Sequence, residues 1–375
     1  MSPRKQGDGS GAAIPAYAVI MAGGGSTRLW PLGRARRPKQ VLSILGKKTL
    51  LQATVDRLAG IFPYDRILVV TGAAHAAEVR RQLPRLGRDR ILVEPLPRNT
   101  TACIALAAEW LATRVGEVMM VATPTDHVVA DEAGERAVIQ TAIALAAREQ
   151  CIATIGIAPA KPETGYGYIE CGERLPRVSP PVFWVKRFHE KPTATVARRY
   201  VAGGRHLWNG GVFVAPVSVF RRVLARHAPK VARPLAGIWQ VRKGTQTRIR
   251  QAYADLPSIP IDVSVMQPLS TQRRPVARIA VVRGAFDWVD AGNWDAMGDL
   301  WPRDAAGNAA HGRVLAIDSQ DSIVYSPKNL VALLGVKNLV VVDAGDVILV
   351  CSRERAQEVR KLSEALRKRN WNRYL

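Results

Sequence analysis

Short apolar segments alternate with helix-patterned segments over the first 160 residues, and this alternation restricts the possible folds more than any other feature of the sequence. The apolar segments lie at 18–21, 66–70, 90–93, 118–122 and 152–158. Between them, apolar residues recur at helical spacing in 50–58, 75–83, 100–115 and 132–149. A strand that returns parallel to its predecessor needs a crossover connection, so this order favours a largely parallel sheet with helices on both faces. We therefore predict an α/β fold whose ligands bind at the carboxyl ends of the strands.

The pattern changes after residue 300, where short strand-like segments follow one another without long helices. They lie at 314–317, 323–325, 331–334, 339–342 and 347–349, and an amphipathic helix follows from about residue 353. We predict a disordered tail at 1–16, a large α/β domain at 17–300, and a small β domain with a terminal helix at 301–375.

Composition agrees with a globular protein of the cytoplasm. The chain has 375 residues, of which 47% are hydrophobic, enough for a buried core. No apolar run reaches the roughly 18 to 20 residues of a membrane helix, and residues 1–16 lack the apolar core of a signal peptide. The four cysteines have no spacing typical of a zinc site or a disulfide framework, so we expect a reduced, cytoplasmic protein without a membrane partner.

The net charge of +23 raises the possibility of a nucleic-acid partner, because clustered lysines and arginines neutralise phosphates. Here the basic residues are spread along the whole chain, and no nucleic-acid-binding module can be recognised. We therefore expect no nucleic-acid partner and look for function in a local site.

The residues from Tyr17 to Leu45 have the composition of a phosphate site. A buried strand at 18–21 leads into Gly23, Gly24 and Gly25, and the cations Arg28 and Lys39 follow. Glycines let a backbone approach a ligand closely and present N–H groups to its oxygens, while fixed cations balance a polyanion. The spacing excludes a P-loop and fits a dinucleotide fingerprint poorly. A glycine-rich turn after a buried strand is the simpler alternative.

Two further strand ends carry polar residues. Glu94 follows one strand, and Asn99 or Thr100 is placed to cap the next helix. Asp126 follows another strand, where a carboxylate beside a triphosphate suits Mg²⁺; it could instead cap the following helix.

Residues 22–32, AGGGSTRLWPL, and the Pro-Lys-Gln at 38–40 resemble the signature of the sugar-1-phosphate nucleotidylyltransferases, and within them of the mannose-1-phosphate guanylyltransferases. Similar matches are EPLPRNTT at 94–101, ATPTDHVV at 122–129, TGYGYI at 164–169, FHEKP at 188–192, WNGGVF at 208–213, IDVSVM at 261–266 and FDWVDAGNW at 286–294. Ser26 departs from the pattern, because the family has glycine there, and serine would be strained if the position requires a positive φ. Ala291 and Asn293 are milder departures.

The resemblance implies a Rossmann-like catalytic domain and a short β-helix-like module. It implies the conversion of GTP and mannose 1-phosphate to GDP-mannose and pyrophosphate, by in-line attack on the α-phosphate. The same chemistry on another nucleotide or sugar 1-phosphate, such as a manno-heptose 1-phosphate, is an alternative, and a non-catalytic regulatory relative is another. A homodimer is possible.

The matched motifs also imply residue roles. Arg28, Lys39 and Lys191 would be catalytic. The nucleotide would bind at Gly23, Gly24, Gly25, Arg28, Lys39, Glu94, Arg98, Asn99, Thr100 and Asp126. The sugar phosphate would bind at Gly167, Glu190, Lys191 and Asn209, and Mg²⁺ at Asp126 and Asp290 rather than Asp287. The role of Asp262 stays open.

Base recognition can be argued from chemistry as well. Guanine presents two adjacent N–H donors, and a carboxylate accepts both. Glu94 is the candidate, unless it forms a salt bridge with Arg98 or caps the helix.

Overall fold

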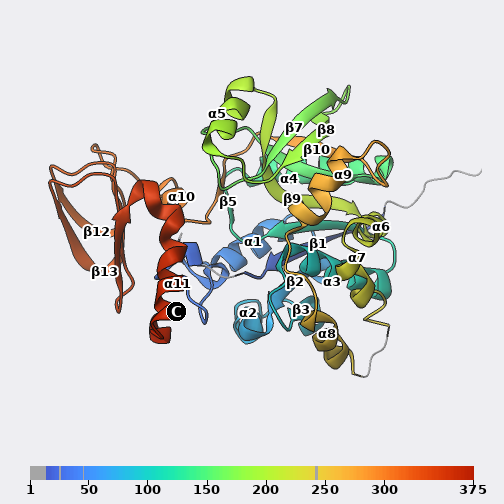
Figure 1. The fold of residues 1–375 in the computed structure, drawn as a ribbon, viewed down its shortest axis with the longest axis horizontal. Helices are drawn as coiled ribbons and strands as arrows, with labels where there is room; N and C mark the ends of the chain where they lie inside the picture. The colour runs from blue at the N-terminus through green and yellow to red at the C-terminus, as the bar shows by residue number, and fades with distance from the viewer. Residues whose placement is uncertain (1–13, 25–26, 45, 241–243) are drawn as a thin grey trace, which may run out of the picture.

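A nine-stranded sheet forms the centre of the computed structural model, which describes residues 14–24, 27–44, 46–240 and 244–375 (Figure 1). The strand order is β3-β2-β1-β4-β9-β6-β10-β8-β7. These strands are β1 (Ala16–Ala22), β2 (Ile67–Gly72), β3 (Ile91–Glu94), β4 (Met119–Pro124), β6 (Ile152–Ile157), β7 (Tyr168–Arg174), β8 (Val182–His189), β9 (His206–Pro216) and β10 (Ile279–Gly284).

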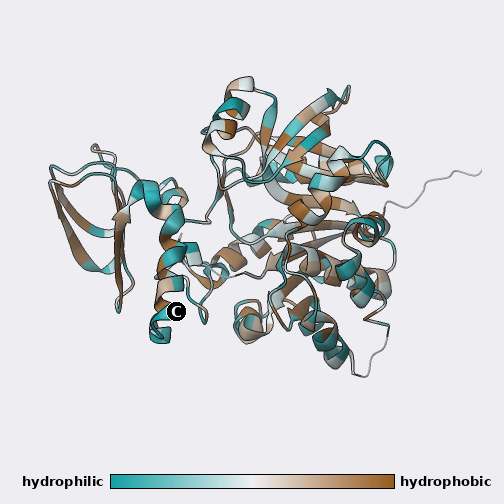
Figure 2. Ribbon diagram, viewed as in Figure 1, coloured by the Kyte–Doolittle hydropathy of each residue, from teal (hydrophilic) through white to brown (hydrophobic). Residues whose placement is uncertain are grey.

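Helices cover both faces of this sheet, as the sequence predicts. Side chains of a strand alternate between the two faces, and here both faces carry apolar side chains that the helices bury. In β1, Val19 and Met21 pack on one side with α3 (Asn99–Arg114), while Ala18 and Ile20 pack on the other with α1 (Leu50–Ala59). The first side also holds α6 (Val217–His227), α7 (Pro229–Leu235) and α8 (Thr245–Ala254), and the second holds α2 (Ala76–Gln82) and α4 (Glu132–Glu149). Figure 2 shows the hydrophobic colouring running along the central strands. The α/β class is confirmed.

Strand direction is more mixed than the alternation predicts. Strands β3, β2, β1 and β4 are mutually parallel, but β9 runs antiparallel between β4 and β6. Strands β7 and β8 form an antiparallel pair, since the short link between them leaves no room for a crossover. The alternating pattern stops before β7, which explains why it did not reveal these directions.

The chain after residue 300 forms a second, four-stranded sheet, at the left of Figure 1. Its strands are β12 (Ala309–Ile317), β13 (Ile323–Leu334), β14 (Leu339–Asp343) and β15 (Ile348–Ser352). Strands β12, β13 and β14 are parallel although short loops connect them. Flat sheets cannot make such connections, whereas successive coils of a β-helix can, so the β-helix-like prediction agrees with this geometry.

The helical segments after β15 return the chain to the large α/β part. The 3₁₀ segment η7 (Arg353–Val359) and helix α11 (Arg360–Lys368) lie between the small sheet and the rest (Figure 1). A separate apolar cluster joins Leu29 and Trp30 of the glycine-rich loop to Trp294, Tyr325 and Ala356. The loop is therefore packed directly against the C-terminal module. Among the described residues, no helix is long and apolar enough to cross a membrane.

Candidate active site

The glycine turn lies at the carboxyl end of β1, where ligand sites of such sheets are found. Gly24 has a φ of 106°, a conformation that favours glycine, and both Gly23 and Gly24 are exposed. The predicted ligand residue Gly25 and the departing residue Ser26 lie outside the described residues.

Lys39 is held near this turn by its neighbour. Gln40 is fully buried, and its Nε2 donates to the carbonyl oxygen of Ala22 at 2.9 Å, which ties the short 3₁₀ segment η2 (Lys39–Val41) to the end of β1. The ammonium of Lys39 forms an ion pair with Asp126. A cation and a carboxylate from separate motifs are thus brought into contact.

A two-stranded sheet brings the two predicted metal ligands together. Strands β5 (His127–Val129) and β11 (Trp288–Asp290) pair antiparallel, with Asp290 opposite His127. The backbone N–H of Ala291 donates to the carbonyl oxygen of Asp126 at 2.8 Å. Arg57 of α1 donates to the His127 carbonyl at 3.2 Å, and this bond helps to fix the position of β5.

The electrostatics of the pair fit a divalent cation. Burial raises the pKa of Asp126, but the charge of Lys39 together with His127 and hydrogen bonds to Asp290 and Lys39 holds the pKa below its ordinary value. Burial and the charge of Asp126 raise the pKa of Asp290, whose Oδ1 is buried without a hydrogen-bond partner among the described residues. Two carboxylates at one place repel each other unless a cation lies between them, and an orphaned oxygen leaves a position for a metal bond. The donor set therefore fits a small divalent ion.

Arg28 lies beside the same carboxylates. A Cβ added to Gly292 would be 2.9 Å from Asp290 Oδ1 and 3.1 Å from Arg28 Nη2, so both groups border the same glycine. Arg28 also donates from Nη1 to Gln357 Oε1 at 3.3 Å. Gln357 belongs to η7 and was not anticipated from the sequence, because no local pattern joins residues 329 positions apart.

Glu94 is buried at the end of β3, with 5% of its surface exposed. Its Oε1 accepts a hydrogen bond of 3.1 Å from the Tyr253 hydroxyl, and a Cβ added to Gly23 would be 3.5 Å from Oε2. Burial raises its pKa to about 7. One carboxylate oxygen is thus held by Tyr253, a residue the sequence did not suggest, while the other borders the glycine turn.

The residues after Glu94 make structural contacts that differ from those expected. Arg98 forms no salt bridge with Glu94; it donates to the carbonyl oxygens of Tyr253 and Ala254 in α8. The expectation that Asn99 or Thr100 is the cap of α3 was wrong, because the N-cap position is Arg98, whose side chain makes no capping bond; Asn99 Oδ1 only accepts from the adjacent Thr100 N–H at 2.9 Å. Asn99 instead has a φ of 63°, and the Thr100 hydroxyl accepts from the backbone N–H of Ile261 at 2.9 Å.

The four predicted sugar-phosphate residues lie close together. A Cβ added to Gly167 would be 2.9 Å from Glu190 Oε2, and Asn209 donates its backbone N–H to the Gly167 carbonyl at 2.8 Å. Lys191 is exposed and pairs with Glu190 at 2.8 Å. At Lys191, a φ of 45° reflects a turn that a lysine rarely adopts.

Asp262, whose role the sequence left open, joins this group. Asn209 Nδ2 donates to Asp262 Oδ1 at 2.8 Å, and burial followed by the charge of Glu190 raises the pKa of Asp262 to about 6. Asp262 begins a short π-helix (Asp262–Met266), a feature often found at functional sites. The Asn209–Asp262 group adjoins the Asp126–Asp290 group, since a Cβ on Gly211 would be 3.7 Å from the His127 ring.

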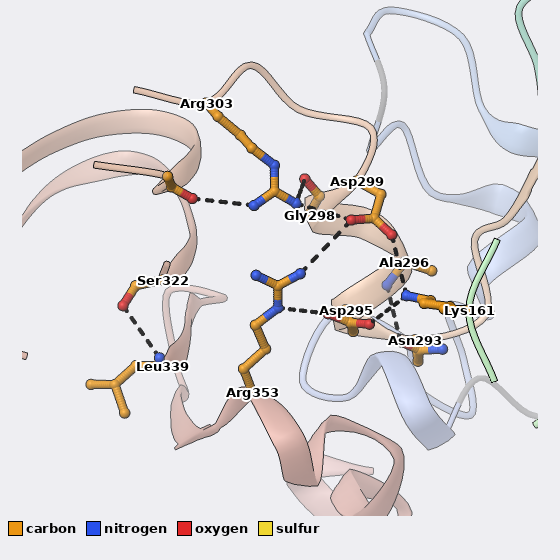
Figure 3. Close-up of polar contacts among 11 residues, drawn as sticks. Lys161, Asn293, Asp295, Ala296, Gly298, Asp299, Arg303, Ser322, Leu339 and Arg353 are labelled. Carbon is orange, nitrogen blue, oxygen red and sulfur yellow. Dashed lines mark hydrogen bonds and ion pairs between the residues drawn. The ribbon is translucent and has the colours of Figure 1, made fainter. Parts of the chain in front are cut away.

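The C-terminal module is fastened beside this site by an ion-pair network, shown in Figure 3. Arg353 Nε donates to Asp295 Oδ1 at 2.6 Å, and Lys161 pairs with Asp295 Oδ2 at 3.1 Å. Asp299 binds Arg303 at 2.9 Å. Lys161 precedes the TGYGYI loop, and Arg353 begins η7, so the network joins both elements to α10 (Trp294–Gly298) and the turn after it.

The geometry can be compared with known proteins. The model of the nucleotidyl transferase family matches residues 17–306, and the model of the mannose-phosphate isomerase/GMP-like beta-helix domain matches 312–366. A xanthan biosynthesis protein of Xanthomonas campestris is 37% identical over 349 residues, covering 92% of this chain and 72% of the relative. A mannose-1-phosphate guanylyltransferase of Escherichia coli is 35% identical over 361 residues, covering 94% and 73%.

Solved structures agree with the sequence relatives. A Thermus thermophilus crystal structure described as a mannose-1-phosphate geranyltransferase superposes with a TM-score of 0.83 at 35% identity, covering 94% of this chain and all of that one. Family models, relatives and fold all agree, and the chain therefore belongs to the nucleotidyl transferase family, among the mannose-1-phosphate guanylyltransferases.

Proposed function

We propose that this enzyme makes GDP-mannose and pyrophosphate from GTP and mannose 1-phosphate. A phosphate oxygen of the sugar phosphate forms a bond to the α-phosphorus of GTP, and the bond from that phosphorus to the bridging oxygen breaks, so that pyrophosphate leaves. The attacking oxygen is already ionised at neutral pH, so no general base is required. Catalysis then reduces to positioning and charge neutralisation.

The meeting of Arg28, Lys39, Asp126 and Asp290, which follow or end different strands, carries this proposal, because it supplies cations and carboxylates where a polyphosphate has to be held. Lys39 would stabilise the α-phosphate as its charge shifts, with a phosphate oxygen replacing its present partner Asp126. Arg28 would hold the leaving pyrophosphate.

Members of this family use a divalent metal, and we propose Mg²⁺ held by Asp126 and Asp290. A bound Mg²⁺ neutralises phosphate charge and prefers one or two carboxylates together with phosphate oxygens and water.

The sugar phosphate would bind between Gly167, Glu190, Lys191 and Asn209. Glu190 and Asn209 present hydrogen-bonding groups suited to sugar hydroxyls, and the exposed Lys191 ammonium can reach a phosphate. Asp262 orients the Asn209 amide, which leaves the amide oxygen to the backbone of Gly211 at 3.1 Å.

A pyrophosphate-release assay over a grid of nucleoside triphosphates and sugar 1-phosphates tests the proposal. We expect the highest kcat/KM with GTP and mannose 1-phosphate. A higher value with a manno-heptose 1-phosphate or with another nucleotide would reassign the substrate within the same chemistry, and no release with any pair would favour a regulatory relative.

A further inference from the structure

Three side chains suited to a transition metal meet on neighbouring strands of the central sheet, away from the two aspartates. They are Glu170 of β7, His189 at the end of β8 and His206 at the start of β9. One ligand atom from each lies within 4.8 Å of the other two. Glu170 and His206 are direct partners in the β7–β9 ladder, and Tyr168, two residues before Glu170, pairs with His189.

The two imidazoles are half-buried. Nδ1 of His206 is buried and accepts no hydrogen bond within the described part of the chain. A buried ring nitrogen without a partner is costly, and a metal bond would satisfy it.

Neighbouring side chains already orient the three groups. The Tyr200 ring stacks on His206 with centroids 3.9 Å apart and an interplanar angle of 17°, and its centroid is 5.0 Å from that of His189. Lys186 donates to Glu170 Oε1 at 2.8 Å, while no described residue hydrogen-bonds Glu170 Oε2. Ligands of a tetrahedral metal at about 2.1 Å are roughly 3.4 Å apart, so small side-chain rotations would close the site.

We propose that Glu170, His189 and His206 bind a divalent transition metal, with Zn²⁺ as the best match. Two imidazoles and one carboxylate suit Zn²⁺ rather than Mg²⁺, which prefers oxygen ligands, and water would fill the remaining position. The charges of Lys186, Arg187 and Arg205 act on the two imidazoles and would oppose the charge of a bound metal.

Such a metal would fasten together three strands that carry the proposed sugar-phosphate residues. His189 directly precedes Glu190, and His206 lies three positions before Asn209. The site does not depend on which sugar phosphate the enzyme uses, since its ligands are distinct from the proposed substrate contacts.

The test measures metal content and thermal stability. The full-length protein is freed of metal by a chelator, and Zn²⁺ is then added in excess Mg²⁺, which occupies oxygen-ligand sites. At a Zn²⁺ concentration that just saturates wild type, we expect wild type to bind one more Zn²⁺ per chain than the His189→Gln and Glu170→Gln variants. Each variant should bind this Zn²⁺ at least tenfold more weakly. Addition of Zn²⁺ should raise Tm in wild type alone.

His227→Ala is the matched control, because His227 also has a buried ring nitrogen without a described partner, and it belongs to no group of metal-ligand residues in the described part of the chain. It should bind Zn²⁺ as wild type does. If His189→Gln and Glu170→Gln, with unchanged metal-free Tm, kept wild-type Zn²⁺ stoichiometry and affinity, the site would be refuted. The pyrophosphate assay is independent, so either proposal can fail alone.

Discussion

At the scale of single residues, Glu94 is a carboxylate whose burial opposes its ionisation. Its carboxylate is buried beside the glycine turn, and among the described residues only the Tyr253 hydroxyl donates a hydrogen bond to it. Burial raises its pKa to about 7. An unfavourable buried carboxylate becomes useful if guanine supplies the missing donors, which is the role we propose for it.

Glu94→Gln should therefore weaken function and improve stability. Loss of the charged acceptor should raise the activation free energy of the reaction with GTP by about 1 to 3 kcal/mol, and so lower kcat/KM for GTP. It should also reduce discrimination against UTP. The raised pKa of Glu94 makes the native state bind the proton more tightly than the unfolded chain, so its stabilising contribution is present at low pH and is lost as pH rises through about 7. The free energy of unfolding of the variant, relative to wild type, should rise by about 2 kcal/mol between pH 5 and pH 8.

Two measurements check this prediction. Denaturant unfolding at both pH values tests the stability effect, and kcat/KM for GTP against UTP tests base recognition. An unchanged nucleotide ratio would mean that Glu94 does not read the base, whatever its stability effect.

The two proposed lysines differ in their surroundings, and their variants should differ in kinetics. Lys39 is largely enclosed beside Asp126, whereas Lys191 is exposed beside Glu190. Lys39→Ala should mainly lower kcat, because it removes charge from the transition state, and Lys191→Ala should mainly raise KM for mannose 1-phosphate. Steady-state kinetics with both substrates decides this, with Lys47→Ala as an exposed control; exchanged profiles would exchange the roles.

At the scale of elements, the pairing of β5 with β11 brings two distant carboxylates together. It places Asp290 opposite His127, so that carboxylates 164 positions apart share one site. Backbone pairing is a rigid way to achieve this, since the ladder sets the register of both side chains.

Either Asp126→Asn or Asp290→Asn should lower turnover by about a hundredfold or more, because each removes a proposed Mg²⁺ ligand. The exposed Asp287, three residues before Asp290, offers Asp287→Asn as a control that keeps activity. Turnover across a Mg²⁺ titration, and in EDTA, is the measurement. Wild-type activity that survives EDTA would contradict the metal assignment.

At the scale of the whole molecule, the C-terminal module contacts the glycine-rich loop. Trp30 and Leu29 share an apolar cluster with Tyr325 and Ala356, and Gln357 accepts from Arg28 at 3.3 Å. The network of Arg353, Asp295 and Lys161 fastens the same region (Figure 3). We propose that 17–300 and 301–375 are two domains, but this packing makes the second one part of the support of the active site.

Gln357→Ala should lower kcat/KM for GTP several-fold, because Arg28 loses an acceptor that orients it. Gln357→Glu, which keeps an acceptor, should restore most of the loss, and Glu354→Ala tests an exposed neighbour on the same segment. Tm must stay unchanged in all three. A loss in Gln357→Ala that follows a fall in Tm would indicate a structural role only.

The local pattern of the sequence determined much of this protein. Alternating segments were enough to predict an α/β sheet, because apolar periodicity depends on nearest neighbours within each element. The sequence motifs identified Gly23, Asp126, Glu190 and Asp290 as candidate site residues. A motif can be compared with a family without knowledge of the contacts that its residues make.

Tertiary structure decided which of these groups meet and what they meet. The antiparallel course of β9, the Tyr253 bond to Glu94 and the Gln357 bond to Arg28 join positions far apart in the chain. The same holds for the gathering of Glu170, His189 and His206, three residues that no spacing rule connects. Such contacts depend on strand order and register across the whole sheet, and these are set by packing between elements rather than by the residues within any one of them.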